Sequence, residues 1–273
     1  MLSDVWRHDL EIVLTELGIS TTGLVQLRST NNVVVLVEPL GIVAKMHRDP
    51  AAASRELRVA LALHRADAPV GPPAIGVPPV VHDTDGWHVT FWSYLARVGS
   101  EPDAEAIAVS LRELHHRFRE QQQECEPLPP CTASLEDAES VIRAGALDDR
   151  VEPEDRALLL DVLGASVEGI DHHLDAALHG SPHVANVIPA AGGLRFIDFE
   201  TACRGPVEWD VAHLDRRAAR AFGTGLDLGL LDTCRDAVSA ATATWCFAGI
   251  DRGPDMRDHA VHHLEIVRSR AAG

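Results

Sequence analysis

The spacing of apolar residues changes once along the 273-residue chain, near positions 92–97, and this change limits the folds it can adopt. Before that point, the short β-branched runs at 33–37 and 42–46 are typical of buried strands. After it, apolar residues recur at helical spacing. The sequence therefore predicts an α+β fold, with a small sheet region over residues 1–95 and a larger helical region over residues 96–273.

One helix is expected inside the N-terminal region. Asp49 suits the N-cap and Pro50 suits the first helical position, so the sequence predicts a helix over residues 50–65. Its apolar face would carry Leu57, Leu61 and His64. A hairpin is expected farther on, because residues 83–86 have turn composition and lie between two short β-type runs.

The C-terminal region predicts a series of helices. Apolar residues recur every three or four positions over 107–118 and 159–174. The longest loop is expected over residues 121–130. Further helices are expected over residues 134–145, 209–222, 227–248 and 258–271.

Composition excludes several classes of protein. The formal net charge of −17 opposes binding to nucleic acid and to anionic membranes. No apolar run reaches the roughly 20 residues that span a bilayer, and the N-terminus has no apolar signal core, so we expect a cytoplasmic protein. The five cysteines form no C-x-x-C pair, so neither a disulfide framework nor a structural zinc site is expected.

Lysine occurs only once in the chain, at Lys45, although lysine and arginine together number 24. A compact ammonium differs from a guanidinium where a point charge must lie against a phosphate. Lys45 falls within the strand predicted over 42–46, where its side chain has a fixed direction. Its uniqueness and its position favour a phosphate-binding role.

A two-stranded ribbon is predicted around a turn at residues 190–193. Short strands at 187–188 and 194–197 flank this turn, and Asn186 and Asp198 lie six positions on either side of its centre near residue 192. An antiparallel ribbon folded there brings the two side chains together at its open end. An amide oxygen and a carboxylate held in this way can bind Mg²⁺ beside the phosphates of a nucleotide.

The surrounding motif resembles a known family. The chain reads H-G-S-P-H-V-A-N over 179–186, then I-D-F-E over 197–200 and E-W-D over 208–210. This resembles the active-site region of aminoglycoside phosphotransferases and choline kinases, whose pattern is H-G-D-x-x-x-x-N, then I-D-[FW]-[DEG], then a later aspartate. The strong match covers about residues 178–214, and a weaker match covers the first 95 residues.

The resemblance implies a two-lobed protein kinase-like fold. The N-terminal lobe, residues 1–95, would be a small mixed β-sheet that binds ATP or GTP, with its hinge near residues 92–95. The helical lobe, residues 96–273, would carry the catalytic loop, the metal site and the acceptor site. The implied reaction is transfer of the γ-phosphoryl group to a hydroxyl of a small molecule.

The resemblance also implies roles for individual residues. Asn186 and Asp198 would bind Mg²⁺, and Lys45 would contact the nucleotide phosphates. Glu56 would pair with Lys45, although a solvated carboxylate on a helix is the competing interpretation. Asp210 would brace the catalytic loop rather than react. The remaining nucleotide contacts would come from Ser29, Thr30, Asn31 and Asn32 over the phosphates, and from Trp92 and Tyr94 beside the base.

One catalytic position departs from the family pattern. The aspartate that accepts the proton of the acceptor hydroxyl corresponds to Ser181, and serine is no base at neutral pH without help. General-base assistance is typically worth about 10²–10⁴ in rate, and His183 or Glu200 could supply it. Ser181, His183 and Asp198 are thus the predicted catalytic residues. The alternative is a pseudokinase that binds nucleotide and acts by regulation or binding.

Rival motifs are weaker. His179 and His183 have the spacing of a helical zinc pair, but Gly180 and Pro182 between them argue against a helix. The glycines at 223–229 miss the G-x-G-x-x-G spacing by one residue, and no G-x-S-x-G elbow is present.

Overall fold

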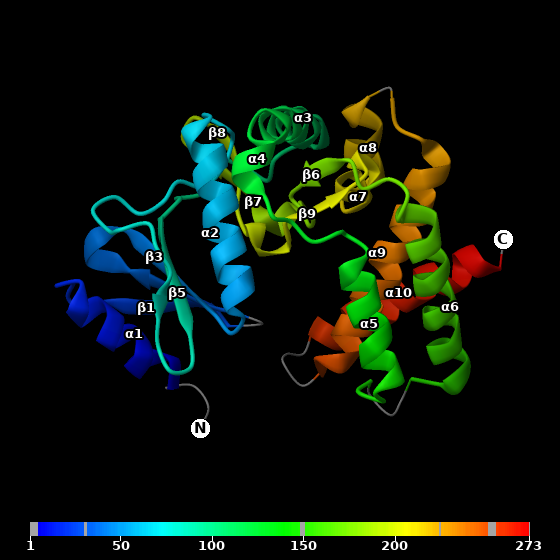
Figure 1. The fold of residues 1–273 in the computed structure, drawn as a ribbon, viewed down its shortest axis with the longest axis horizontal. Helices are drawn as coiled ribbons and strands as arrows, with labels where there is room; N and C mark the ends of the chain where they lie inside the picture. Colours follow the sequence, from blue (N-terminus) through cyan, green and yellow to red (C-terminus); the bar gives the residue numbers. More distant parts are fainter. Residues whose placement is uncertain (1–4, 30–31, 148–150, 224, 251–254, 273) are drawn as a thin grey trace. The chain divides into compact units, whose positions relative to one another are not determined.

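The computed structural model describes residues 5–29, 32–147, 151–223, 225–250 and 255–272 (Figure 1). The chain forms two compact units. The first comprises Met1–Leu128 and Ser181–Ala202, and the second comprises Pro129–Gly180 and Cys203–Gly273. The predicted division at residue 95 separates a nucleotide-binding lobe from an acceptor-binding lobe. It stays a prediction, because the two compact units do not test where nucleotide and acceptor bind.

The first unit is built on an antiparallel sheet of five strands in the order β1-β2-β3-β5-β4. The predicted strands over 33–37 and 42–46 and the predicted hairpin are confirmed. The strands are β1 (Leu24–Ser29), β2 (Val33–Val37), β3 (Ile42–His47), β4 (His82–Asp83) and β5 (His88–Ser93). The short helix η1 (Glu38–Leu40) joins β2 to β3, and Gly41 at its end takes the left-handed conformation, with φ of 58°.

Side chains along β3 alternate between the two faces of the sheet, and this determines which of them face the candidate active site. Ile42, Ala44 and Met46 are buried in an apolar cluster that includes residues of α1 (Val5–Glu16), so they point to one face of the sheet. Because side chains of a strand alternate between faces, Lys45 and His47 point together to the other face. Both are buried, at 7% and 1% exposure.

Helix α2 (Pro50–Arg65) confirms the helix predicted over 50–65. The Asp49 carboxylate accepts a hydrogen bond from the Ala51 N–H, which caps the first turn. The predicted apolar face was wrong in part, since His64 is exposed and Leu61 only half-buried. The buried face instead consists mainly of small residues with one carboxylate among them: Ala53, Glu56, Leu57, Val59, Ala60, Ala62 and Leu63.

The predicted ribbon is confirmed in the same unit. Strands β7 (Val187–Ala190) and β8 (Gly193–Phe196) pair from Val187 opposite Phe196 to Ala190 opposite Gly193. The short helices η2 (Val184–Asn186) and η3 (Phe199–Thr201) flank the ribbon. Helix α3 (Ala104–Glu120), although distant in the sequence, contacts β8. The loop predicted over 121–130 contains a short helix, α4 (Gln122–Cys125), in its first half.

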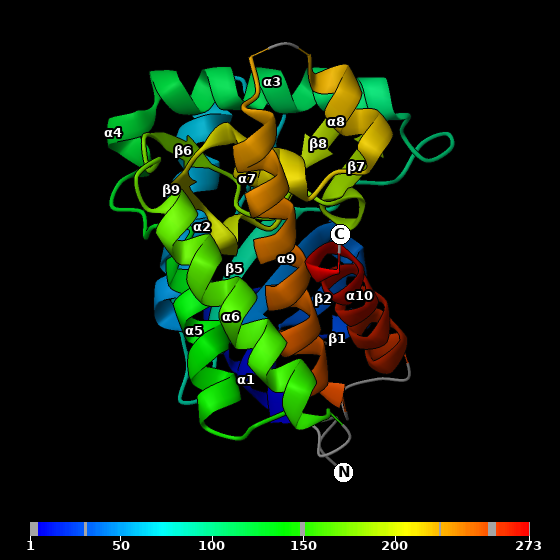
Figure 2. The same cartoon turned by 90° about the vertical axis from the view of Figure 1, so that its right-hand side faces the viewer.

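The second unit is mainly helical (Figure 2). Helices α5 (Ala133–Arg143), α6 (Pro153–Ile170), α9 (Leu228–Ala248) and α10 (Asp255–Ala271) pack against one another, as predicted for their segments. The single helix predicted over 209–222 was wrong: the chain forms α7 (Val207–Ala212) and then α8 (Arg216–Phe222). Asp215 starts α8 by accepting a hydrogen bond from the Ala218 N–H, which is N-cap geometry.

A short two-stranded sheet, β6 (Ala176–Leu178) with β9 (Cys203–Gly205), lies in this second unit. All five cysteines are buried free thiols, as the absence of cysteine pairing in the sequence predicted. Among the helices of the described residues, none combines the length and the apolar character that a bilayer crossing requires.

Candidate active site

Lys45 is the centre of a buried charge cluster in the first unit. Its Nζ lies 2.9 Å from Glu56 Oε2, 2.6 Å from Asp198 Oδ1 and 3.2 Å from Glu200 Oε2. The predicted Lys45–Glu56 ion pair is therefore confirmed. Glu56 is only 2% exposed, so the competing interpretation of a solvated helix carboxylate was wrong.

The charges in this cluster shift one another's pKa values. Burial alone would lower the pKa of Lys45, but Glu56, Asp198 and Glu200 outweigh it and raise that pKa above its ordinary value. Burial would raise the pKa of Glu56, yet Lys45 and His47 hold it below the ordinary value. The pKa of Asp198 is raised by burial and by the neighbouring carboxylates. Lys45 thus remains an ammonium at every physiological pH.

The ribbon positions Asp198 and Asn186 at its open end. The Ile197 N–H donates to the Asn186 main-chain oxygen over 3.0 Å, which extends the pairing by one residue toward Asp198. Asp198 then adopts φ of 72° and ψ of 60°, a left-handed conformation that is uncommon for a residue other than glycine. The residue after Asp198, Phe199, is buried, and its ring centroid lies 6.3 Å from that of Phe118.

A cavity of about 180 Å³ connects the predicted metal and catalytic residues. It is lined by Lys45, Ser181, His183, Asn186, Asp198 and Glu200, among others. The Asn186 Nδ2 donates to the Ser181 main-chain oxygen over 3.0 Å, which fixes Oδ1 as the other end of the amide. Among the described residues, that Oδ1 and the second carboxylate oxygen of Asp198 receive no hydrogen bond.

These two oxygens suit Mg²⁺. A carboxylate oxygen and an amide oxygen are hard ligands of the kind that magnesium binds, and both line one cavity. Asn186 is itself buried, at 4% exposure, so its orientation is fixed by its surroundings. The donor set therefore fits the ion that the sequence predicts at this site.

The two candidate bases, Glu200 and His183, have different neighbours. Glu200 Oε2 accepts from Asn32 Nδ2 and lies near Lys45 and His47, and these partners lower the pKa of Glu200 to about 2 despite its burial. A carboxylate of such low basicity is a poor general base. His183 Nε2 lies 3.4 Å from Asn186 Nδ2 and faces the cavity that Ser181 also lines.

The bracing role predicted for Asp210 is seen within the second unit. Its carboxylate is fully buried and accepts hydrogen bonds from the N–H groups of His179, over 3.1 Å, and Gly180, over 2.8 Å. Trp209 Nε1 also donates to the Gly180 carbonyl over 3.0 Å. These bonds fix the two residues that directly precede Ser181 in the chain.

A second, more apolar cavity of about 280 Å³ lies in the first unit beside Lys45. Trp92 and Tyr94 line it, together with Val34, Val43, Ala60 and Phe196. Of the four residues predicted to cover the phosphates, Ser29 is exposed at the end of β1 and Asn32 reaches Glu200. Thr30 and Asn31 lie outside the described residues.

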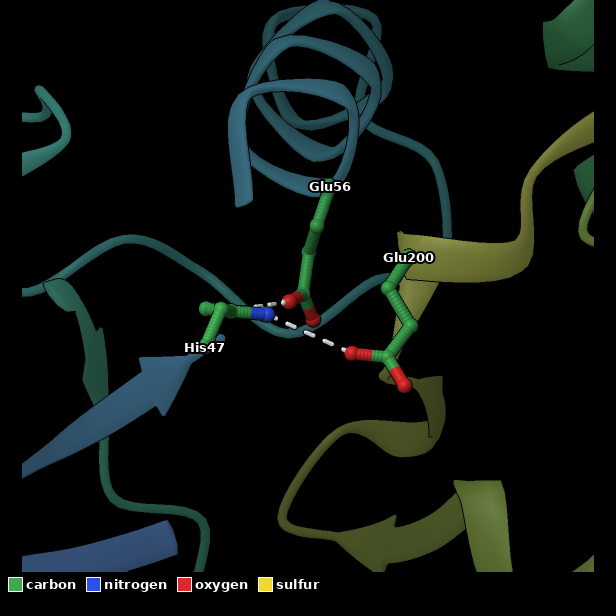
Figure 3. A group of neighbouring side chains, drawn as sticks. All are labelled: His47, Glu56 and Glu200. Carbon is green, nitrogen blue, oxygen red and sulfur yellow. Dashed lines mark ion pairs between the residues drawn. The ribbon is translucent and has the colours of Figure 1, made fainter. Parts of the chain in front are cut away.

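His47 is the site residue that the sequence did not reveal (Figure 3). Its Nε2 lies 3.1 Å from Glu56 Oε2 and its Nδ1 lies 3.3 Å from Glu200 Oε2. The predicted strand ended at residue 46, whereas β3 extends to His47, so the alternation that places His47 on the face of Lys45 was missed. The chain contains 15 histidines, and nothing else in the sequence singles this one out.

The sequence matches one known protein family. The sequence model of the phosphotransferase enzyme family (APH) matches residues 25–242. Comparison with curated protein sequences gives no significant match.

Solved structures of kinase-like fold align with nearly the whole chain. A choline/ethanolamine kinase family protein from Mesorhizobium loti aligns with a TM-score of 0.65 and 16% identity, over 98% of this chain and 94% of that chain. Amicoumacin kinase hAmiN aligns with a TM-score of 0.71 and 14% identity, over 99% and 96%. Aminoglycoside 2′-phosphotransferase-IIIa in its GDP complex aligns with a TM-score of 0.66 and 15% identity, over 97% and 98%. The chain has a protein kinase-like fold and belongs to the phosphotransferase enzyme family.

Proposed function

We propose that the protein transfers the γ-phosphoryl group of ATP or GTP to a hydroxyl of a small molecule. The observation that carries this proposal is the Lys45 ammonium held between Glu56 and Asp198, at 2.9 Å and 2.6 Å, beside a cavity lined by Asn186. Phosphoryl transfer depends mainly on positioning and on charge stabilisation, and these residues supply both.

The nucleotide would occupy two neighbouring regions of the first unit. The apolar cavity lined by Trp92 and Tyr94 suits the flat face of a base, and Lys45, which lines both cavities, would contact the phosphates. Related kinases have been solved with GDP or with AMP-PNP, so both nucleotides belong in the test.

Asn186 and Asp198 would hold Mg²⁺ through the two oxygens that receive no hydrogen bond from the described residues. When bound, the ion would neutralise charge that develops on the phosphate oxygens. The residues around it keep the site ordered: Lys45 holds one Asp198 oxygen, and the Ser181 carbonyl orients the Asn186 amide.

The reaction requires a destination for one proton. The acceptor oxygen bonds to the γ-phosphorus, the bond from that phosphorus to the β-phosphate bridging oxygen breaks, and the hydroxyl proton leaves. We assign its acceptance to His183, which lines the cavity with Ser181, whereas Glu200 is held by Lys45, His47 and Asn32. Ser181 would then position the acceptor hydroxyl rather than remove its proton.

The related kinases support a small-molecule acceptor. Solved relatives bind kanamycin, amicoumacin and hygromycin B, which are small molecules with hydroxyl groups. Amine-bearing acceptors suit this chain as well, since its formal net charge of −17 attracts cations.

The test is transfer of labelled γ-phosphate from ATP and from GTP to a panel of aminoglycosides, amino alcohols and neutral polyols, in the presence of Mg²⁺. A phosphorylated acceptor formed by the native protein, and lost in Asp198→Asn with its fold intact, supports the proposal. Arg143→Gln on the surface of α5, whose side chain is 64% exposed, is the matched control. Transfer that persists in Asp198→Asn would contradict it.

Ser181 favours a second candidate function, a pseudokinase. A catalytic loop without the aspartate of its family has lost the residue that usually accepts the proton. In that case the native protein binds nucleotide but phosphorylates no member of the panel. Nucleotide affinity measured beside transfer separates the two functions.

A further inference from the structure

His47 lies between two carboxylates that belong to different elements of the first unit (Figure 3). Glu56 comes from α2 and Glu200 from η3, and their Oε2 atoms lie 3.1 Å and 3.3 Å from the two ring nitrogens. His47 is 1% exposed, so water cannot replace these partners. The imidazole therefore bridges the helix and the segment that follows Asp198.

The cluster has a large excess of negative charge unless His47 is charged. Three carboxylates, Glu56, Asp198 and Glu200, surround the single Lys45 ammonium. With a neutral imidazole the cluster carries two uncompensated negative charges in a buried site, which is costly. A charged imidazolium halves that excess.

The positions of the ring nitrogens also favour the charged form. A neutral imidazole has one N–H, so its second nitrogen would present a lone pair to a carboxylate oxygen. A charged imidazolium has an N–H at each ring nitrogen and so attracts both carboxylate oxygens. The Thr90 hydroxyl of β5, 3.5 Å from Nε2, is the neutral neighbour on the remaining side.

A metal ion is the competing occupant. His47, Glu56 and Glu200 could each offer one ligand atom within 4.8 Å of the others. The Lys45 ammonium, however, already lies 2.9 Å and 3.2 Å from the same two glutamate oxygens. A metal there would face that ammonium at close range, so the geometry disfavours it.

We propose that His47 is a buried imidazolium that positions Glu56 and Glu200 and lowers the negative charge that an incoming nucleoside triphosphate meets. The proposal rests on the proposed phosphotransferase function. His47 does not touch the reacting atoms; it acts through Glu56 and Glu200 on Lys45. Its charge keeps Glu200 from drawing Lys45 away from the phosphates.

The charged groups around His47 favour its protonated form on balance. From β3 the Lys45 charge opposes protonation of His47, whereas Glu56 from α2 and Glu200 from η3 favour it. Burial also opposes protonation, but the two carboxylates prevail and the pKa of His47 is raised above its ordinary value. The imidazolium should therefore persist at neutral pH and be lost as the pH rises further.

The first experiment follows the His47 ring by NMR in the native protein, with the resonance assigned by its absence in His47→Gln. We expect the His47 ring to titrate with a pKa above the ordinary value of about 6.5, and its resonance to stay unchanged when Zn²⁺ is added. A pKa at or below that value, or Zn²⁺ ligation by the ring, would overturn the proposal. This measurement needs no catalytic activity, so its outcome is independent of the proposed function.

The second experiment measures nucleotide KM and kcat for His47→Gln, Glu200→Gln and the double variant. One lost charge near the phosphates should raise KM on the order of tenfold in His47→Gln, with a smaller change in kcat. Glu200→Gln should restore KM in the double variant, because it removes the carboxylate that His47 balances. The rise of the native KM with pH should vanish in His47→Gln.

The matched control is His88→Gln. His88 lies opposite His47 in the β3–β5 register but pairs with the exposed Asp83, 2.6 Å away. Its KM should stay at the native value. An unchanged KM in His47→Gln, or a double variant no better than His47→Gln, would contradict the proposed role even if phosphoryl transfer itself is observed.

Discussion

Arg55 Nε donates a hydrogen bond to the main-chain oxygen of Glu200 over 2.7 Å, so helix α2 holds η3 through its backbone. The next residue of the helix, Glu56, forms an ion pair with Lys45. Two consecutive residues of α2 thus position the segment that follows Asp198 and the ammonium that contacts Asp198.

Arg55→Met should loosen this segment while retaining the aliphatic packing of the side chain. A hydrogen bond from a charged donor contributes about 1.5–3 kcal/mol to stability, so we expect the free energy of unfolding to fall by up to that amount and phosphoryl transfer to fall about tenfold. Transfer kinetics and thermal unfolding would be measured together. Arg65→Met, at the exposed end of the same helix, is the control and should transfer phosphate normally.

Lys45→Ala should weaken nucleotide binding and turnover by about 10–100-fold, since a buried charged partner of three carboxylates is removed. Lys45→Arg should not fully rescue either quantity, because a planar guanidinium cannot occupy the position of a compact ammonium among three oxygens. Nucleotide affinity by calorimetry and turnover with the best acceptor are the measurements. Native values of both in Lys45→Ala would refute the role of Lys45.

Ser181→Asp should raise turnover with little change in nucleotide affinity only if the native protein is a slow kinase that lacks a general base. A carboxylate there can accept the hydroxyl proton, which is typically worth about 10²–10⁴ in rate. If His183 is already the base, Ser181→Asp should do little or harm, and His183→Ala should abolish transfer while binding persists. Affinity and transfer for both variants and Glu200→Ala separate these cases.

His263 should make the protein sensitive to mild acid. Its burial, together with the charges of His262 and His259, lowers its pKa to about 4. Between the ordinary pKa of about 6.5 and that value the unfolded chain takes up a proton that the native state does not, so stability falls as the pH falls through this window. His263→Gln should flatten the decline in the free energy of unfolding, whereas His172→Gln at an exposed position should not.

The five cysteines should resist thiol reagents in the native protein. All are buried, and burial raises the pKa of Cys125 and of Cys131 to about 12. Since the thiolate is the reactive form, a colorimetric thiol assay at pH 8 should detect almost none of them before denaturation and all five afterwards. Rapid labelling of a folded sample would show that a segment carrying one of these cysteines opens readily.

The sequence predicted the elements whose patterns are local. The β-branched runs that form β2 and β3 and the turn between β7 and β8 carry their own signals, so these elements were predicted. The ribbon register was off by one residue, because Val187 pairs with Phe196 and Asn186 therefore lies opposite Ile197 rather than Asp198. The N-cap residue Asp49 likewise marked the start of α2.

What depends on tertiary contacts was missed. The pairing of Glu56 with Lys45 was predicted only through the family resemblance, because no pattern within α2 reveals a partner on another element. The buried face of α2 was misplaced because three alanines contribute to it and only two leucines do. The break between α7 and α8 depends on Asp215, whose capping role was hidden among charged residues that a continuous helix also tolerates.

The occurrence of a single lysine has a practical consequence. Within these 273 residues the sole side-chain ammonium lies 2.6 Å from Asp198, in the candidate active site. Protein grown with isotopically labelled lysine would carry its entire label at that one position. A single ammonium resonance would then report nucleotide binding in the native chain, free of overlap and without any substitution.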